Sequence, residues 1–250
     1  MSGHSKWATT KHKKAAIDSK RAKLFTKIQK EILVAAKLGD PNPDFNPRLR
    51  NAVIAARAAN MPKEKINDAI KKASSSSEGE NFEEIRYEGR GPNGVAFIVE
   101  ALTDNKNRTA SNVRAAFTKC GGSLGETGSV SFMFDKVGMI GYEGQKVAED
   151  KLFELALDLG ADNVESTEEW HEILTDPTSF ASVRDGLIKE LGDPDEAKIT
   201  WKPKDVIVID ELEKAEKIQK LIDKLEDDDD VQNVITNIEI TDEIAEKLEA

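Results

Sequence analysis

The sequence is poor in cysteine, in aromatic residues and in long apolar runs. Its single cysteine, Cys120, excludes an internal disulfide framework and favours a reducing compartment, so we expect a cytoplasmic protein. The longest apolar runs, such as Ile32–Ala36 and Val95–Val99, end after five residues, whereas a membrane-spanning helix needs about 20. The basic N-terminus also lacks the apolar stretch of a secretory signal. With an aromatic share of 6%, the cores of this 250-residue chain are predicted to be mainly aliphatic.

The sequence also lacks the residue patterns of catalytic and cofactor sites. Cys120 has no histidine near it in sequence, and the body of the chain contains only His171, so no activated nucleophile is predicted. The N-terminal histidines and Cys120 do not have metal-ligand spacing. The glycine-rich stretches Gly89–Gly94 and Gly121–Gly125 lack the Gly-Lys-Ser/Thr of a P-loop and are predicted to be turns. We therefore expect no enzyme activity, no cofactor, no metal and no small-molecule substrate.

The acidic run Asp227–Asp230 is the only group of carboxylates dense enough to suggest Mg²⁺ binding. It joins a predicted helix to a predicted strand and does not fit the EF-hand pattern. We predict a solvated turn here.

What the sequence does contain is a strong separation of charge. Residues 1–72 carry 17 lysines and arginines against 6 acidic residues, a charge of +11, whereas residues 73–250 carry 19 against 41, a charge of −22. A polyanion is attracted to the first part and repelled by the second. The stretch Ser74–Asn81 is polar and has nothing to bury, so it is predicted to be the linker between them.

Residues 18–73 are predicted to form three helices. The first runs from Asp18 to Lys37 and stops before Gly39, which can take the left-handed turn that ends a helix. The second begins at Pro47, with Asn46 as its N-cap, and the third follows the break at Asn60–Pro62. Each helix is short and amphipathic, so we expect the three to pack together in a basic helical domain, residues 1–78.

The first helix is predicted to present one basic face. At 100° per residue its lysines fall within an arc of about 100° and its apolar residues within a separate arc of about 120°, with Val34 as an apolar exception inside the basic arc. The lysines are Lys20, Lys23, Lys27, Lys30 and Lys37, and the apolar residues are Leu24, Phe25, Ile28, Ile32, Ala35 and Ala36. Together with Arg21, the first four of these lysines are predicted to contact nucleic acid, and a plain solvated face is the alternative.

The segment before the first helix is basic and carries no acidic side chain. Lysines supply sequence-independent phosphate contacts, and the flat indole of Trp7 suits stacking on a base. A purely solvated tail has little use for a tryptophan, so contact with nucleic acid is favoured over a disordered tail. The residues predicted to make this contact are His4, Lys6, Trp7, Lys11, His12, Lys13 and Lys14.

The second helix adds three arginines that could contact phosphate, Arg48, Arg50 and Arg57. The guanidinium group suits bidentate binding of a phosphate. The alternative is that these side chains lie along the core.

A further candidate site is the polar loop Asp104–Thr109, which opens onto a predicted helix. Free backbone N–H groups at the helix start, together with Lys106, Asn107 and Arg108, favour a phosphate site. Simple capping by Asn107 or Thr109 is the alternative.

From Phe82 onward, short strands alternate with helices. Two strands, Ile85–Glu88 and Val95–Leu102, flank a turn-rich connection that is typical of a hairpin. The later elements that we expect are helix Arg108–Cys120, strands Ser129–Phe134 and Met139–Tyr142, helix Val147–Leu159, strands Asn163–Ser166 and Glu169–Leu174, helix Phe180–Leu191, strands Ala197–Trp201 and Val206–Ile209, helix Glu211–Leu225 and strand Val231–Ile238.

This order of elements predicts an α+β multidomain fold. The run from residue 139 to residue 201 is βαββαβ, the ferredoxin-like unit. We expect residues 136–204 to form that domain and to be inserted into an α/β domain made of residues 82–135 and 205–240. The three-helix N-terminal domain precedes both.

Several motifs resemble those of the YebC/PmpR-like family. They keep a fixed order over nearly the whole chain, and the match is weak only between about residues 140 and 195. The motifs are Gly3–Trp7, Lys11–Lys14, Lys23–Lys27, Asn42–Pro43, Asn46–Arg50, Asn60–Pro62, Thr103–Thr109, Gly121–Gly125 and Asp229–Val234. Thr10 departs from the pattern, since an apolar residue is expected there.

The resemblance implies a helical domain followed by two α/β domains and a role in gene expression. Bacterial members are described as DNA-binding transcriptional regulators, a mitochondrial relative activates translation of a cytochrome oxidase subunit, and other members resemble ribosome-associated factors that relieve stalling. The sequence shows no clear helix-turn-helix with base-reading side chains, whereas RNA binding needs mainly basic arms and stacking aromatics. We therefore expect a translation factor that binds RNA or the ribosome, with a DNA-binding transcriptional regulator as the alternative.

Overall fold

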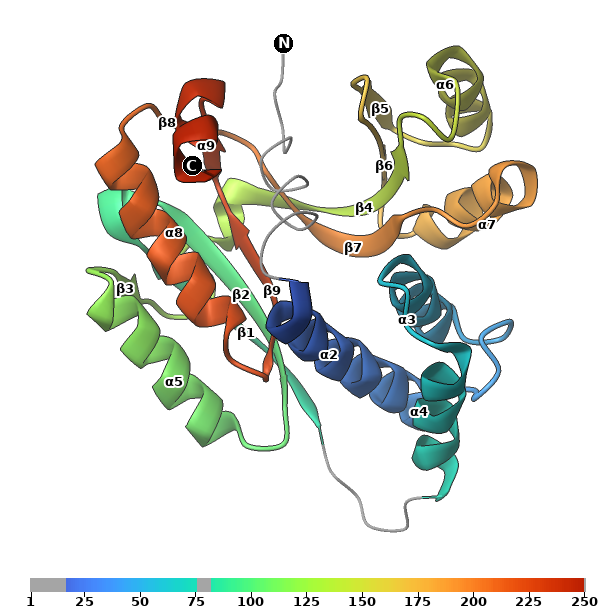
Figure 1. Ribbon diagram of the computed structural model, residues 1–250, viewed down its shortest axis with the longest axis horizontal. Helices are drawn as coiled ribbons and strands as arrows, with labels where there is room; N and C mark the ends of the chain where they lie inside the picture. Colours follow the sequence, from blue (N-terminus) through green and yellow to red (C-terminus); the bar gives the residue numbers. More distant parts are fainter. Residues whose placement is uncertain (1–16, 76–81, 250) are drawn as a thin grey trace. The chain divides into compact units, whose positions relative to one another are not determined.

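The computed structural model describes residues 17–75 and 82–249, which form two compact units. One unit holds residues 17–23, 82–135 and 202–249, and the other holds residues 24–75 and 136–201. Figure 1 labels the elements along the chain. The α+β multidomain fold is confirmed, with three N-terminal helices followed by two sheet-containing α/β regions. No helix of residues 17–75 and 82–249 is long and apolar enough to cross a bilayer.

The three predicted N-terminal helices are confirmed as α2 (Ile17–Leu38), α3 (Pro47–Ala58) and α4 (Lys63–Ser75). Asn46 caps α3, because its Oδ1 accepts a hydrogen bond from the backbone N of Leu49 at 3.0 Å. Asn60, between α3 and α4, has a φ of 57°, a left-handed conformation that asparagine tolerates better than most residues. The sequence signals for helix starts and stops therefore hold in this region.

The first unit contains a four-stranded sheet in the order β3-β1-β2-β9. The predicted hairpin is confirmed, since β1 (Glu83–Arg90) pairs antiparallel with β2 (Ala96–Thr103). Helices α5 (Lys106–Lys119) and α8 (Leu212–Glu226) cover one face of this sheet, as Figure 1 shows. The core between them includes Phe97 and Phe117, whose rings meet edge to face at 5.6 Å.

The C-terminal part of this unit differs from the prediction. The expected single strand Val231–Ile238 is divided into β9 (Val231–Thr236) and β10 (Ile238–Ile240), which belong to different sheets. Asn237 lies between them, accepting a bond from Ala96 N through its side chain and one from Ile207 N through its carbonyl. β10 pairs in parallel with β8 (Ile207–Ile209). Sequence reasoning also missed β3 (Ser123–Leu124) and α9 (Asp242–Glu249).

The predicted strand Ser129–Phe134 is also wrong. Residues 131–133 form a 3-10 turn, and the strand β4 begins only at Phe134. The backbone N–H groups of Val130 and Ser131 donate to the buried carboxylate of Glu88 at 2.9 and 2.8 Å, so they are not available to a sheet.

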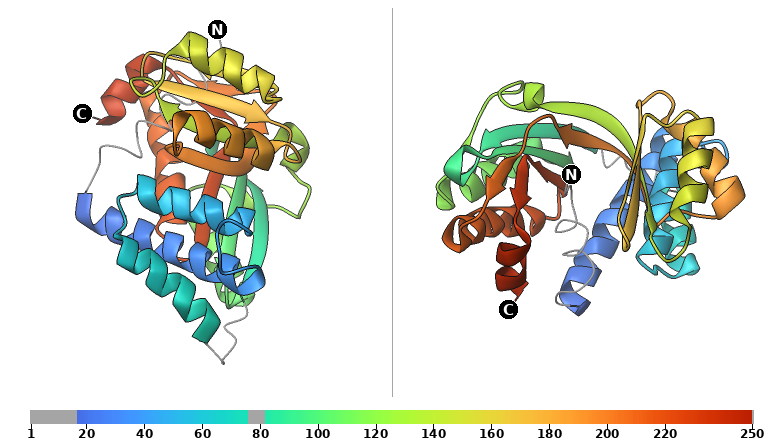
Figure 2. Two further views of the ribbon diagram at one scale, coloured as in Figure 1. Left: turned by 90° about the vertical axis from the view of Figure 1, so that its right-hand side faces the viewer. Right: turned by 90° about the horizontal axis from the view of Figure 1, so that it is seen from above.

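The second unit contains the βαββαβ run: β4 (Phe134–Glu143), α6 (Glu149–Asp158), β5 (Asn163–Ser166), β6 (Trp170–Thr175), α7 (Phe180–Leu191) and β7 (Glu196–Pro203). Its strands are ordered β5-β6-β4-β7, the order of a ferredoxin-like sheet. Figure 2 gives two further views of it. Side chains of α6 and α7, such as Leu152 and Leu187, form the core with Ile140 and Ile173, and Ile54 of α3 joins the same cluster.

The ferredoxin-like region is an insertion whose two ends meet. Its first strand β4 and its last strand β7 are neighbours in the sheet. Directly beyond their ends, Lys204 N donates to Met133 O at 2.9 Å. The chain therefore enters and leaves this region at one place. The division into three domains with the limits given above stays a prediction.

Candidate nucleic-acid interface

The basic segment predicted to contact nucleic acid lies outside the described residues. This holds for His4, Lys6, Trp7, Lys11, His12, Lys13 and Lys14, whose role stays a prediction. Lys20 lies on α2, where the described side chains begin at Arg21.

The other predicted residues of α2 are less exposed than a solvated basic face would be. Arg21 is exposed, but Lys23, Lys27 and Lys30 are only partly so. The Nζ atom of Lys37 is buried and has no hydrogen-bond partner among the described residues. Nucleic-acid contact by Arg21, Lys23, Lys27 and Lys30 stays a prediction, and the charged end of Lys37 is buried.

The helical wheel misplaced two apolar residues of α2. Leu24, assigned to the core, is 47% exposed, and Val34, assigned to the basic arc, is 3% exposed. All residues from Ile32 to Ala36 are buried, so this part of the helix is enclosed on every side. A wheel assumes one buried face, and it fails where a helix is surrounded.

Arg48 on α3 binds a carboxylate of the neighbouring helix. Its Nε and Nη2 donate to the two carboxylate oxygens of Glu31 at 2.6 and 3.0 Å, the bidentate geometry that guanidinium favours. Both side chains are about one-third exposed. The pair therefore joins α3 to α2, and a phosphate would have to displace Glu31.

Arg50 on α3 is bound still more completely. Its Nε donates to Pro43 O at 3.1 Å and its Nη2 to Asp44 O at 2.7 Å, which fixes the loop before α3. Its Nη1 donates to the carboxylate of Asp185 on α7. Contact with phosphate by Arg48 and Arg50 stays a prediction, and it would compete with these internal bonds.

Asp185 also binds Arg184, whose side chain is fully buried. Burial raises the pKa of the Asp185 carboxyl, but the hydrogen bonds from Arg50 and Arg184 outweigh burial and hold that pKa below its ordinary value. The Arg184 guanidinium also donates to the side chain of Asn51 and to Pro47 O, and it lies 5.6 Å from the centre of the Phe180 ring. The start of α3 is therefore attached to α7 by a buried network that sequence reasoning did not find.

At the start of α5 the cap is Asn105, not Asn107 or Thr109. The Oδ1 of Asn105 accepts a bond from Arg108 N at 3.1 Å. Thr103 Oγ1 accepts from Asn105 N at 2.9 Å and so holds the cap residue in place. The backbone donor that a phosphate was expected to bind is therefore partly used by the protein itself.

The side chains around this helix start are held by Asp230. The Oδ2 of Asp230 lies 3.1 Å from Thr103 Oγ1, 2.8 Å from Thr109 Oγ1 and 2.7 Å from Arg108 Nη2. Asp230 is 5% exposed, so the predicted solvated turn is wrong for this residue. Its carboxylate is therefore bonded to groups at the helix start where a phosphate was predicted to bind.

Arg108 is neutralised from two sides, by Asp230 and by Asp104, each at 2.7 Å. The hydrogen bonds to Asp230 and then to Asp104 raise the pKa of its guanidinium above the ordinary value. Lys106 lies 3.9 Å from a carboxylate oxygen of Glu83, and Asn107 is exposed. A phosphate contact by Lys106, Asn107 and Arg108 stays a prediction at a site whose positive charge is already balanced.

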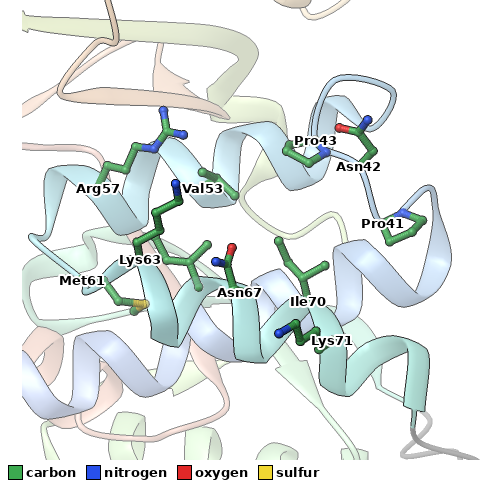
Figure 3. Close-up of a pocket in the computed structure, with 11 residues that line it drawn as sticks. Pro41, Asn42, Pro43, Val53, Arg57, Met61, Lys63, Asn67, Ile70 and Lys71 are labelled. Atoms are coloured by element: carbon green, nitrogen blue, oxygen red, sulfur yellow. The ribbon is translucent and has the colours of Figure 1, made fainter.

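A different surface carries lysines that are not paired with carboxylates of the described residues. Helices α3 and α4 and the loop before α3 enclose a groove of about 630 Å³, shown in Figure 3. The residues that line it are Pro41, Asn42, Pro43, Val53, Arg57, Met61, Lys63, Ile66, Asn67, Ile70 and Lys71. Apolar and cationic side chains both line the groove, and no acidic residue does.

The groove was not predicted, although part of its signal is in the sequence. Lys63, Asn67 and Lys71 fall within an arc of about 80° on α4, a polar stripe that a helical wheel would have shown. The lining residues from α3 and from the loop before it could not have been predicted, because only the fold brings them next to α4. Lys63 and Lys71 were therefore missing from the predicted site.

The described residues offer no metal centre. Within residues 17–75 and 82–249, no group of three or more His, Cys, Asp or Glu side chains is placed to hold a metal ion. His171 is buried, with Nδ1 2.9 Å from Ser166 Oγ and Nε2 3.0 Å from Val147 O. The carbonyl only accepts, so Nε2 donates to it and both ring nitrogens serve the fold. Cys120 caps the end of α5 and packs against the core.

Comparisons with known proteins agree with this architecture. Residues 5–76 match the family model described as the TACO1/YebC protein N-terminal domain, and residues 82–238 match the model described as the TACO1/YebC second and third domain. The crystal structure of a conserved hypothetical protein from Aquifex aeolicus is similar, with 50% sequence identity and a TM-score of 0.84. The similarity covers 94% of this chain and 97% of that chain, so it includes the helical region and both α/β regions.

Proposed function

Since the chain belongs to the TACO1/YebC family, we propose that it regulates gene expression by binding RNA, at the ribosome, as a translation factor or activator. Family membership supports a nucleic-acid-binding regulator. The observation that carries the proposal is the separation of charge, +11 in residues 1–72 against −22 in residues 73–250. A phosphate polymer gains free energy by releasing counterions only where cations are concentrated.

The exposed cations of the helical region support a binding role further. Lys65 and Lys72 of α4 are exposed, whereas the arginines of α3 are bound to carboxylates. Lysines serve as sequence-independent phosphate contacts, which is what recognition of a folded RNA by shape requires. We propose a role in binding rather than in catalysis, and this is supported by His171 and Cys120, whose side chains contact other parts of the fold.

A DNA-binding transcriptional regulator is the second candidate. One observation favours it: α3 and α4 are joined by only four residues, 59–62, as in a helix-turn-helix. Against it, the arginine side chains that read guanine best are bound within the protein at Arg48 and Arg50.

Replacing Lys11, Lys13 and Lys14 together by alanine tests the proposed contact. We expect weaker binding of the full-length protein to every RNA sequence and a decrease of about 2 to 3 in the slope of log K against log[salt]. The matched control replaces Lys214, Lys217 and Lys220 of α8, which changes the net charge equally but within the acidic body. Fluorescence anisotropy at several salt concentrations measures both, and an unchanged slope in the first variant would exclude this arm.

Crosslinking in cells followed by sequencing of the attached nucleic acid separates the two candidates. Recovery of ribosomal RNA supports the translation factor. Recovery of promoter DNA supports the transcriptional regulator instead. If neither ribosomal RNA nor promoter DNA is recovered above the level of a non-binding control, both candidate functions are wrong.

A further inference from the structure

The groove between α3 and α4 combines an apolar floor with a cationic rim. Val53, Met61 and Ile66 close its bottom, each less than 10% exposed. Pro41, Pro43 and Ile70 extend this apolar lining toward the surface. A volume of about 630 Å³ lies within the range of ligand pockets in proteins, about 300 to 1,000 Å³.

Two of the rim cations, Lys63 and Lys71, are available for binding. Lys63 and Lys71 are exposed, and neither has an ion pair with a carboxylate of the described residues. Arg57 is bonded to Asp193, yet its side chain is 61% exposed. Figure 3 shows the rim side chains of α3 and α4 along the groove. A ligand with carboxylates above an apolar surface would complement this arrangement.

The wall formed by the loop before α3 is held rigidly. Asn46 is 6% exposed, and its Nδ2 donates to Ala35 O at 2.8 Å and Asp40 O at 2.9 Å. Asn42 N donates to the Asp40 side chain, and Arg50 binds the carbonyl of Pro43. Because the wall is fixed by these bonds, a ligand pays little for ordering it.

From this geometry we propose that the groove binds an acidic amphipathic helix of a partner protein. Lys63 and Lys71 are eight residues apart on α4, about 12 Å along its axis, which corresponds to two to three turns of a bound helix. Apolar residues at positions i, i+4 and i+7 of that helix would enter the floor, and its glutamates or aspartates would face the rim. This inference goes beyond the nucleic-acid contact and does not depend on it.

A protein helix fits the lining better than a nucleic acid does. Bases bind to proteins by stacking on aromatic rings, and no aromatic residue lines the groove. Aliphatic residues, proline and methionine are instead the lining of grooves that take leucine-like side chains. The phosphate backbone would satisfy the lysines but leave the apolar floor without a partner.

Two designed peptides provide the test. Each is a helical 15-residue peptide with leucines on one face, and the remaining positions are glutamate in one peptide and lysine in the other. We expect the full-length protein to bind the fluorescein-labelled glutamate peptide in an anisotropy titration and to bind the lysine peptide much more weakly. Binding is expected to weaken with added salt, because ion pairs at the rim are screened.

Variants then assign the binding to the groove. Lys63→Glu with Lys71→Glu should raise the Kd of the acidic peptide about ten-fold or more. Asn67→Trp, which places a large side chain in the groove, should abolish binding of the acidic peptide. The control Lys65→Glu with Lys72→Glu makes the same change of charge on the same helix but outside the lining, and should alter the Kd less than about three-fold.

Three results would overturn the inference. They are equal binding of both peptides, an unchanged Kd in Lys63→Glu with Lys71→Glu, and loss of binding in the control variant to the same degree. A 15-nucleotide RNA that binds more weakly to Lys63→Glu with Lys71→Glu, when the acidic peptide does not bind at all, would assign the groove to nucleic acid instead. All four lysines and Asn67 are exposed. Lys65 also lies 5.6 Å from the centre of the Phe25 ring, so circular dichroism checks that the control variant folds as the others do.

Discussion

Helices α3 and α4 follow each other in the chain and both carry basic side chains, but they use them differently. Each arginine of α3 is bonded to a carboxylate: Arg48 to Glu31, Arg50 to Asp185 and Arg57 to Asp193. On α4, Lys63 and Lys71 have no such partner among the described residues. The comparison shows that positive charge in a sequence indicates a binding surface only where the fold leaves it uncompensated.

The residue types match these two roles. Guanidinium is planar and binds a carboxylate through two parallel hydrogen bonds, which suits contacts inside the protein. The lysine ammonium is a hydrated point charge on a flexible stem, which suits contacts with a ligand. The start of α5 resembles α3 in this respect, since Asp230 and Asp104 balance the charge of Arg108.

The largest expected effect concerns the buried attachment of α3 to α7. Arg184→Ala should lower the free energy of unfolding by about 3 kcal/mol, because it removes a fully buried side chain, leaves Asn51 without its donor and leaves Asp185 with Arg50 alone. Urea denaturation measures this loss. Lys189→Ala, an exposed position on the same helix, should stay within about 0.5 kcal/mol. A loss below about 1 kcal/mol for Arg184→Ala would mean that the network does not hold α3.

A smaller effect is expected from Asp185→Asn, and it should depend on pH. The side chain of Asp185 is 41% exposed, so solvent screening limits the loss to about 1.5 kcal/mol at pH 7. Its pKa is lowered in the folded protein, so its stabilisation is fully present above the ordinary pKa of 3.8 and is lost as the pH falls through the lower folded-state value. Urea denaturation from pH 7 to pH 3 should show the wild type approaching the variant. A constant difference across that range would contradict the assignment.

The smallest effects compare α3 and α4 directly. Arg48→Ala should cost about 1 kcal/mol through its bidentate pair with Glu31, and a double-mutant cycle with Glu31→Ala should return most of that as coupling energy. Lys63→Ala with Lys71→Ala should change stability by less than about 0.5 kcal/mol. Should the lysine variant prove the less stable of the two, the contrast between the helices would be wrong.

Much of the fold could be predicted from the sequence, because its signals are local. Asn46-Pro47 begins α3, and apolar periodicity places most ferredoxin-like elements within about two residues of their observed ends. The exception is β4, which begins at Phe134 and not at Met139. The errors occur where a distant group takes over a backbone hydrogen bond. Glu88 binds the N–H groups at residues 130 and 131, and the Asn237 side chain binds Ala96 N. The sequence near each of these backbone N–H groups does not indicate that Glu88 or Asn237 will bind it.

The candidate site was less predictable for the same reason. The basic composition of the N-terminal region is a property of the sequence, but which charges remain free depends on long-range pairing. Arg50 and Asp185 are 135 residues apart, and Arg108 and Asp230 are 122 apart. Sequence reasoning does not distinguish paired cations from unpaired ones, so it selected Arg50 and Arg108 and omitted Lys63 and Lys71.

The two ends of the inserted region, β4 and β7, meet, so the chain could close without that region, but Ile54, Pro47 and Asn51 of α3 would then lose their partners in it. A single short loop between Met133 and Lys204 could bypass it, because their backbones are already hydrogen-bonded. Removing it would also take away Asp185 and Asp193, and so would uncover the guanidinium groups of Arg50 and Arg57. The aspartates of the insertion thus compensate positive charge on α3. An insertion without these aspartates would leave more uncompensated positive charge on the helical region.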